Sequence, residues 1–258
     1  MSRLTHWEGE PVAVWSHLWG VPELEVHDTV GSTNDRVRER AGSGAAPWTV
    51  VLAEEQTRGR GRSGDGWHSP PGSGLWISTL VPVGTSSAPC LPLLVGLAAA
   101  RALEEAAAGG EVGIKWPNDL MVGDRKVGGI LCEGTGSSVV VGVGINVRTP
   151  PGGFPGSLRG VATSVEDEAG RRVSRATLAT GLLNGLRTVM EKRGEEGVEE
   201  LRPGEVEEVR RRDVLAGRRL VTGAGEGTGK GVDARGALLL ERPDGTVARV
   251  VAGSVRLA

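Results

Sequence analysis

The chain has 258 residues, of which 38% are hydrophobic, enough for one large domain with a small second one. Its 30 lysines and arginines nearly balance 32 aspartates and glutamates, which excludes the strongly basic field of non-specific nucleic-acid binding. Cys90 and Cys132 lack metal-ligand spacing and no charge-free apolar run reaches membrane-spanning length, so we expect a cytoplasmic protein without a zinc site or a disulfide framework.

The first thirty residues predict a short helix and then a strand near residues 24–27, with no room for a helix-turn-helix domain. The next stretch, GSTNDRVRERA, predicts a helix that begins with a capping box of Ser32 and Asp35. Ser32, Thr33 and Asn34 either only cap this helix or also form a small polar pocket for an amide or ureido group.

The stretch EEQTRGRGRSGDGWHSPPGSGLWIS, residues 54–78, joins two predicted buried strands at 49–54 and 74–83. Arginines and glycines alternate in it: Arg58, Gly59, Arg60, Gly61 and Arg62, followed by Gly64 and Gly66. Glycine permits positive φ and arginine binds carboxylate or phosphate, so the loop either wraps an anionic ligand or is a solvated linker. Trp67 and Trp76 favour the first interpretation, because a solvated linker gains nothing from burying large rings.

Leucines and alanines at helical spacing predict a buried helix over residues 89–108. The segment VGIKWPNDLMVGDRKVGGILCE then predicts a short strand that ends before Pro117, and a hairpin of strands 119–122 and 126–132 around a Gly-Asp turn. Lys115 and Lys126 interrupt these apolar runs, and half-buried cations need anionic partners.

The run VVVGVGINV, residues 139–147, predicts a central strand whose polar Asn146 needs a partner, for which a ligand is one candidate. Helices are predicted at 164–169 and 174–192. The charged stretch 195–212, interrupted by Pro203, is interpreted as a connection. Five short strands separated by glycine turns then predict a small barrel.

These motifs together resemble the biotin protein ligase family. The matching pieces lie in the family's order: GSTN at 31–34, EEQTRGRGRSG at 54–64, WHSP at 67–70, KWPNDL at 115–120, RKVGGIL at 125–131, GVGINV at 142–147 and GVDARGALLLE at 231–241. Each piece alone is a weak signal, whereas seven pieces in order are a strong one.

The resemblance implies an α+β fold: a mixed sheet flanked by helices, like the core of class II aminoacyl-tRNA synthetases, over residues 1–211, and an SH3-like barrel over residues 212–258. It implies the ligase-only form, without an N-terminal DNA-binding domain and without DNA binding, as a monomer or homodimer. The implied reaction makes biotinyl-5′-adenylate from biotin and ATP with Mg²⁺, and then transfers biotin to a lysine of a biotin carboxyl carrier protein.

The resemblance also assigns residues to roles. Catalytic roles fall to Lys126, Arg62 and Lys115. Biotin binding falls to Ser32, Thr33, Asn34, Gln56, Arg60, Gly61, Arg62 and Lys126. Nucleotide binding falls to Lys115, Asn118 and Asn146. No residue is assigned as a metal ligand, and Asp119 belongs to the site without an assigned role. The sequence departs from the family at Asp65, where many members have a further loop arginine. Either another cation, with Arg58 as a candidate, compensates for this arginine, or the loop contacts ATP less.

Two other functions stay open. A lipoate or octanoyl ligase or transferase shares the implied core and acyl chemistry, although the Arg-Gly-Arg and KWPND stretches argue against it. A non-catalytic module, with the barrel as an interaction domain, is the second alternative. Exchange between ATP and pyrophosphate that depends on biotin separates both from a biotin ligase.

Overall fold

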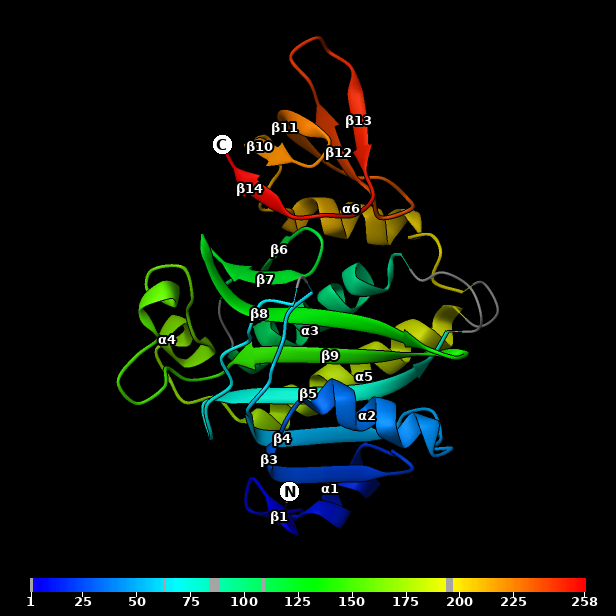
Figure 1. The fold of residues 1–258 in the computed structure, drawn as a ribbon, viewed down its shortest axis with the longest axis vertical. Helices are drawn as coiled ribbons and strands as arrows, with labels where there is room; N and C mark the ends of the chain where they lie inside the picture. Colours follow the sequence, from blue (N-terminus) through cyan, green and yellow to red (C-terminus); the bar gives the residue numbers. More distant parts are fainter. Residues whose placement is uncertain (1, 63, 84–88, 108–109, 194–196) are drawn as a thin grey trace.

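The computed structural model describes residues 2–62, 64–83, 89–107, 110–193 and 197–258, and it contains two main sheets (Figure 1). The larger has seven strands in the order β3-β4-β5-β9-β8-β7-β6. Their bounds are β3 Leu24–Val30, β4 Val50–Gln56, β5 Gly74–Pro82, β6 Gly113–Lys115, β7 Asp119–Val122, β8 Arg125–Thr135 and β9 Ser138–Asn146. Only β3 and β4 pair in parallel, so the sheet is mixed and β9 lies at its centre, as the sequence predicts.

The smaller sheet is antiparallel and contains the five strands predicted after residue 213, in the order β13-β12-β11-β10-β14. Their bounds are β10 Arg219–Thr222, β11 Gly225–Val232, β12 Leu238–Glu241, β13 Val247–Val250 and β14 Val255–Leu257. Helix α6, Pro203–Arg212, lies between the two sheets (Figure 1). Pro203 opens this helix and does not interrupt it, because the first turn needs no backbone donor from proline. Residues 195–196 of the predicted connection lie outside the described residues.

Helices α3, Leu91–Ala107, and α5, Arg175–Arg193, cover one face of the large sheet, and α2, Thr33–Gly42, covers part of the other (Figure 1). Small residues bring α3 and α5 together: a Cβ at Gly185 would lie only 3.3 Å from Cβ of Ala98. Position 108 of the predicted helix lies outside the described residues. Two short helices, η1 at Gly156–Leu158 and α4 at Val165–Ala169, follow β9.

The N-terminal part contains a hairpin that the sequence did not predict, β1 His6–Trp7 with β2 Glu10–Pro11, followed by the predicted short helix α1, Val12–Leu18. Residues before the hairpin pair with the outer edge of β3, and Asp213 pairs with β6 at the opposite edge. Both edges of the large sheet are therefore covered, which hinders edge-to-edge association.

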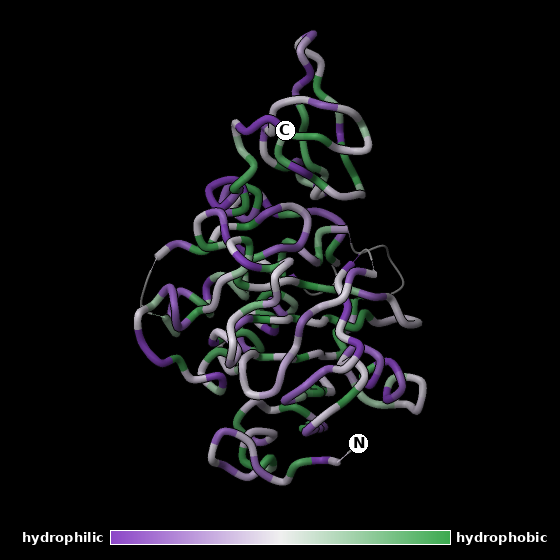
Figure 2. The backbone as a smooth tube through the Cα atoms, turned by 60° about the vertical axis from the view of Figure 1, so that its left-hand side comes forward, coloured by the Kyte–Doolittle hydropathy of each residue, from purple (hydrophilic) through white to green (hydrophobic). Residues whose placement is uncertain are grey.

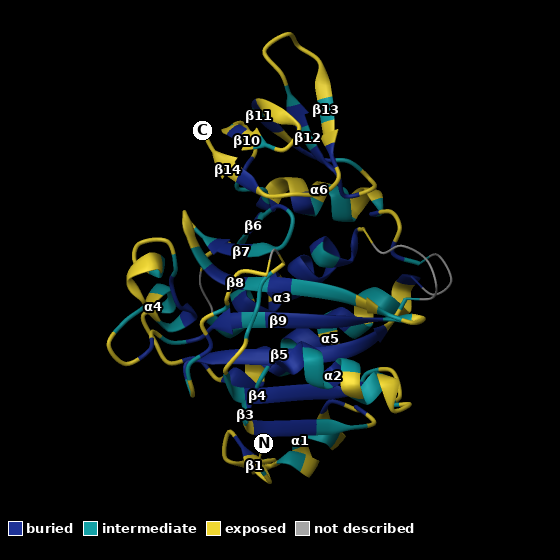
Figure 3. Cartoon of the chain, viewed as in Figure 1, coloured by how far each residue is buried: buried dark blue, intermediate teal, exposed yellow. Residues whose placement is uncertain are grey.

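The alternation of β9 decides where a cavity can form. Val139, Val141, Val143 and Ile145 point into the core beneath α3 and α5, whereas Val140 on the opposite face packs against Val37 of α2. Figure 3 shows the buried strands of the large sheet, and Figure 2 shows hydrophobic stretches concentrated inside the molecule. Among the described residues, no helix is long and apolar enough to cross a membrane.

One local prediction, the capping box, is wrong. Ser32 is the N-cap of α2, but its side chain makes no capping hydrogen bond, and Asp35 forms ion pairs with arginines instead of closing a capping box. Of Gly59, Gly61, Gly64 and Gly66 in the loop, all of which permit positive φ, Gly64 adopts it, with φ of 81°. Gly59 has a different role, because a Cβ there would lie 2.8 Å from both the Ser69 hydroxyl and the Trp67 carbonyl oxygen.

Candidate functional site

One cavity of about 370 Å³ lies on the α2 face of the large sheet. Every residue to which the sequence assigns a role lines it: Ser32, Thr33, Asn34, Gln56, Arg60, Gly61, Arg62, Lys115, Asn118, Lys126 and Asn146. These residues come from the start of α2, the loop after β4, the segment between β6 and β7, and strands β8 and β9. The fold therefore gathers motifs that are far apart in the sequence around one space. The biotin, nucleotide and catalytic roles of these residues stay predictions.

Glycines form the floor of this cavity. Gly142 and Gly144 continue the face of β9 that begins with Val140, and Gly129 pairs with Gly144 from β8. A Cβ at Gly144 would lie 2.7 Å from Nε1 of Trp67, and a Cβ at Gly142 would clash with the Asn34 amide. Sequence reasoning did not assign these glycines, although their alternate spacing in VGVG indicates one strand face without side chains.

A cluster of amide and hydroxyl groups lies at the N-terminus of α2. The Gln56 side-chain oxygen accepts hydrogen bonds from the Thr33 backbone N–H, at 2.9 Å, and from the Thr33 hydroxyl, at 3.1 Å. The Ser78 hydroxyl oxygen lies 2.7 Å from both the Thr33 hydroxyl and the Asn34 side-chain oxygen. Ser78 is fully buried and was not predicted. The cluster offers donors and acceptors at fixed positions, which suits recognition of a small polar ring.

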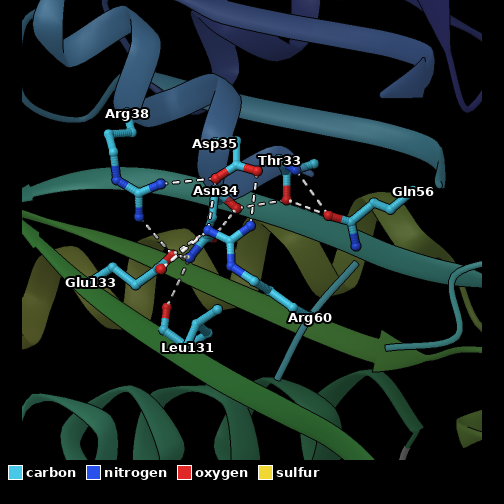
Figure 4. A network of polar contacts seen from close by, with 9 residues as sticks. Thr33, Asn34, Asp35, Arg38, Gln56, Arg60, Leu131 and Glu133 are labelled. Atoms are coloured by element: carbon cyan, nitrogen blue, oxygen red, sulfur yellow. Dashed lines mark hydrogen bonds and ion pairs between the residues drawn. The ribbon is translucent and has the colours of Figure 1, made fainter. Parts of the chain in front are cut away.

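A network of charges, drawn in Figure 4, lies beside the amide cluster. The Arg60 guanidinium donates to both carboxylate oxygens of Asp35, at 2.7 and 2.8 Å, and to Glu133 at 3.1 Å. Arg38 of α2 pairs with the same two carboxylates, each at 2.9 Å. Glu133 also accepts a hydrogen bond of 2.7 Å from the Asn34 amide. The network thus connects α2, β8 and the loop after β4.

Both carboxylates of this network are held in the charged form. Hydrogen bonds from Arg60 lower the pKa of Asp35, against the smaller opposing effect of burial. Burial alone raises the pKa of Glu133, but hydrogen bonds from Asn34 and Arg60 outweigh it and the pKa is lowered. The pKa of Arg60 is raised, mainly by its hydrogen bond to Asp35. Sequence reasoning missed Glu133 because no local pattern marks it.

Lys126 lies near the start of β8, whereas Glu133 of the network lies near its end, and Lys126 has its own partner. Its Nζ is 2.6 Å from Oδ1 of Asp119 and 5.0 Å from the centre of a Trp67 ring. The Lys126 backbone bonds to Val161 and Thr163 of the segment after β9, which fixes the strand from which the side chain projects. The expectation that this lysine needs an anion is confirmed by the pair with Asp119, and its side chain is still 33% exposed.

The predicted nucleotide residues Lys115, Asn118 and Asn146 all line the cavity. The Asn118 side-chain amide donates to the Ile130 carbonyl oxygen at 2.7 Å, and that of Asn146 donates to the Thr163 carbonyl oxygen at 3.1 Å. Lys115 forms no ion pair with any described residue. The predicted need of Asn146 for a partner is therefore met at least partly within the protein. Phe154 and Leu158 add an apolar wall that the sequence analysis did not assign.

The loop after β4 folds back on itself as an irregular hairpin, with backbone bridges Gln56 to Ser69 and Arg60 to Gly66. The Arg62 guanidinium donates to the Gly253 carbonyl oxygen, at 3.3 Å, in the turn between β13 and β14. Arg58 packs against Gly31 and does not line the cavity, so the suggestion that it replaces the missing loop arginine is wrong. Asp65 itself lines the cavity.

Known proteins resemble this chain in sequence and in fold. A model of the Biotin/lipoate A/B protein ligase family matches residues 27–149. The bifunctional ligase/repressor BirA of Escherichia coli is 35% identical over 252 residues, which cover 91% of this chain and 74% of that protein. The chain belongs to the biotin protein ligase family. The resemblance inferred from the motifs is thereby confirmed.

Other members of the biotin protein ligase family are similar over different lengths. BirA of Bacillus subtilis is 38% identical over 177 residues, and the chain spans about half of that protein, 53% of its length. Among solved structures, biotin protein ligase from Aquifex aeolicus in complex with biotin and ATP gives a TM-score of 0.80 at 27% identity. That match covers 92% of this chain and 100% of the Aquifex chain. The mixed α+β fold with a large sheet is therefore the fold of this family.

Proposed function

We propose that this protein is a biotin–[biotin carboxyl carrier protein] ligase, which activates biotin with ATP and transfers it to a specific lysine of the carrier. The observation that carries the proposal is the single cavity in which an amide cluster, two lysines and a loop arginine meet. Relatives named as biotin–[acetyl-CoA-carboxylase] ligases, such as that of Mycobacterium tuberculosis at 38% identity over 138 residues, support it.

In the first half-reaction a carboxylate oxygen of biotin attacks the α-phosphorus of ATP, the bond to the β-phosphate oxygen breaks, and pyrophosphate leaves. The main barrier is the approach of two anions, which fixed cations lower by electrostatic stabilisation. Lys126 stands in the cavity beside Asp119, so an incoming carboxylate meets an ammonium group that is already in position. We assign Lys115 and Asn118 to the nucleotide phosphates and Asn146 to the nucleotide side, and Thr33 with Gln56 to the ureido ring.

Magnesium fits the residues present. Mg²⁺ prefers one or two carboxylates together with phosphate oxygens to an all-protein cage, and the described residues contain no group of three or more metal-ligating side chains. Asn118 and Asp119, both at the cavity beside Lys115, would hold the ion near the polyphosphate. When bound, it would neutralise charge on the pyrophosphate leaving group.

In the second half-reaction the uncharged amine of the acceptor lysine attacks the biotinyl carbonyl carbon, and the anhydride bond to AMP breaks. Because a mixed anhydride hydrolyses easily, the site must shield it until the acceptor arrives. Arg62 of the loop donates to the Gly253 carbonyl oxygen, and both residues line the cavity. We propose that Arg62 helps to close the loop over the adenylate.

We further propose that residues 1–211 form the catalytic domain, with a core like that of class II aminoacyl-tRNA synthetases, and that residues 212–258 form an SH3-like domain. The five-stranded antiparallel sheet that follows α6 supports this division. The two parts are joined tightly, since Nε1 of the buried Trp116 donates to the Gly236 carbonyl oxygen at 2.9 Å. The small domain would thereby support the KWPND segment.

The test is a pyrophosphate exchange assay with biotin, lipoate or octanoate as the acid. We expect exchange of label between pyrophosphate and ATP with biotin alone. Exchange that depends on lipoate or octanoate would assign the protein to the other branch of the family whose model it matches. No exchange with any of the three acids would revive the two interpretations that need no ATP, a transferase and a non-catalytic module.

A further inference from the structure

We propose that Arg60 is a positioning residue that ties the loop after β4 to the body of the protein, and that its guanidinium does not bind the carboxylate of the substrate. This inference rests on the proposed function and changes the role assigned to Arg60 from the sequence. The inference rests on the carboxylates of Asp35 and Glu133, which contact the Arg60 guanidinium from two separate elements, α2 and β8 (Figure 4).

The guanidinium of Arg60 is already neutralised within the protein. It binds Asp35 with two parallel hydrogen bonds of 2.8 and 2.7 Å, the geometry in which arginine and carboxylate are most complementary. It also contacts both carboxylate oxygens of Glu133, at 3.1 and 3.2 Å. The network then consists of four side chains with two positive and two negative charges: Arg60, Arg38, Asp35 and Glu133. A substrate carboxylate that approached Arg60 would compete with two fixed anions, whereas Lys126 has only one, Asp119.

The anchors of Arg60 lie outside the cavity. Asp35, Arg38 and Glu133 do not line it, whereas Arg60 and Gly61 do. The guanidinium therefore points away from the ligand space toward α2 and β8, and the tie acts on the backbone of the loop. Asp35 lies 25 residues before Arg60 and Glu133 73 residues after it, so the tie joins three separate parts of the chain.

The tied backbone is the part of the loop that touches the amide cluster. A Cβ at Gly59 would lie 3.3 Å from Nε2 of Gln56, and Gln56 in turn accepts both hydrogen bonds from Thr33. The backbone N–H of Trp67 donates to the Gly59 carbonyl oxygen at 2.9 Å, so the second strand-like segment of the loop hairpin moves with Gly59. Loss of the hydrogen bonds from Arg60 to Asp35 and Glu133 should therefore release this segment of the loop from the biotin side of the cavity, while the nucleotide side stays in place.

The chain offers a matched pair of variants. Asp35→Asn removes the charge that receives both short bonds from Arg60, yet Asp35 does not line the cavity, so a change in biotin affinity cannot come from a lost ligand contact. Arg38→Met is the control: it removes a guanidinium from the same two carboxylates, but Arg38 belongs to α2 and ties no loop.

The experiment measures kcat and the KM values for biotin and ATP by pyrophosphate exchange, with the rate of tryptic cleavage of the loop in the ligand-free protein. For Asp35→Asn we expect the KM for biotin to rise about tenfold, the size of one lost charge-assisted contact. The KM for ATP should stay within twofold and cleavage should become faster. Arg38→Met should match the wild type in all of these. The double variant Asp35→Asn with Arg60→Met should bind biotin no more weakly than Arg60→Met alone, because both changes cut one tie.

The result that overturns the inference is a rise of the KM for biotin in Arg60→Met while Asp35→Asn keeps the wild-type KM and cleavage rate, since Arg60 would then bind substrate directly. Equal effects of Asp35→Asn and Arg38→Met would also overturn it, because the network would then act only on overall stability. If Asp35→Asn does not fold, Arg60→Lys carries the test, since an ammonium cannot form the two parallel bonds. Failure of the wild type to exchange pyrophosphate with biotin would count against the proposed function, and the ligand-free cleavage rates would still test the tie.

Discussion

Replacing Lys126 by alanine should abolish activation of biotin while leaving the fold intact. A cation about 4 Å from a unit negative charge, at the effective dielectric constant of a partly exposed site, contributes about 4 kcal/mol. If that interaction is made at the transition state, its loss slows adenylate formation by about a thousandfold. The Lys126 side chain is 33% exposed and its pair with Asp119 is a partly exposed ion pair, so the free energy of unfolding should change by about 1 kcal/mol or less.

The assay is biotin-dependent exchange of label between pyrophosphate and ATP, with the thermal midpoint of each variant measured in parallel. Lys230→Ala is the matched control, because Lys230 forms a similar pair with Glu241, at 2.9 Å, on the small sheet away from the cavity. It should keep full activity. Exchange by Lys126→Ala at a rate within tenfold of wild type, with both variants folded, would refute the electrostatic role of Lys126.

Three further predictions follow from the loop and from a buried carboxylate. Tryptic cleavage between Arg58 and Gly72 should slow when biotin and ATP are added, because charged and apolar contacts with the ligand offset the entropy cost of ordering a glycine-rich loop. Arg62→Gly should still form the adenylate, weakened by no more than about one charge-assisted contact, but release it early, so that an unrelated protein in the tube becomes biotinylated. Glu25→Gln should lower the thermal midpoint at pH 7 and lose this effect as the pH falls from about 4.5 to about 2. Burial alone raises the pKa of Glu25, but hydrogen bonds from Arg36 and His27 outweigh it and lower the pKa from 4.5 to about 2, so the stabilisation is present above the unfolded pKa and lost as the pH falls through the folded one.

For each of these three predictions, one result would contradict it. Equal cleavage with and without ligands would show that the loop does not order on binding. No more bystander labelling by Arg62→Gly than by wild type, with adenylate synthesis preserved, would show that Arg62 does not retain the intermediate. A difference in thermal midpoint between Glu25→Gln and wild type that stays constant down to pH 2 would show that the Glu25 charge is not the source of the stabilisation.

Much of the scaffold could be predicted because it depends on local patterns. The continuous apolar run of β9, the leucine and alanine spacing of α3 and the Gly-Asp turn between β7 and β8 each follow from the composition, periodicity or turn chemistry of a few neighbouring residues. The same holds for the five short strands of the small sheet, whose glycine turns mark their ends. Lys126 stood out because a cation interrupts an otherwise apolar hairpin.

The features that escaped prediction depend on contacts between distant parts of the chain. The sequence indicates that Arg60 binds an anion but not which one, and its partner Glu133 is 73 residues away. The Ser-x-x-Asp spacing predicts a capping box closed by Asp35, but Asp35 binds an arginine from the loop instead of the backbone N–H groups. The strands of the hairpin β1 and β2 have only two residues each, too few to show the alternation of apolar and polar side chains that identifies a strand.

The central claim is that this protein joins biotin to a lysine of a carrier protein at the expense of ATP. The most direct measurement is the intact mass of a biotin carboxyl carrier domain incubated with the protein, biotin, ATP and Mg²⁺. We predict the addition of one biotinyl group, absent without ATP and absent when the acceptor lysine of the carrier is replaced by arginine. An unchanged mass with biotin, together with addition of a lipoyl or octanoyl group when those acids are supplied instead, would contradict the account.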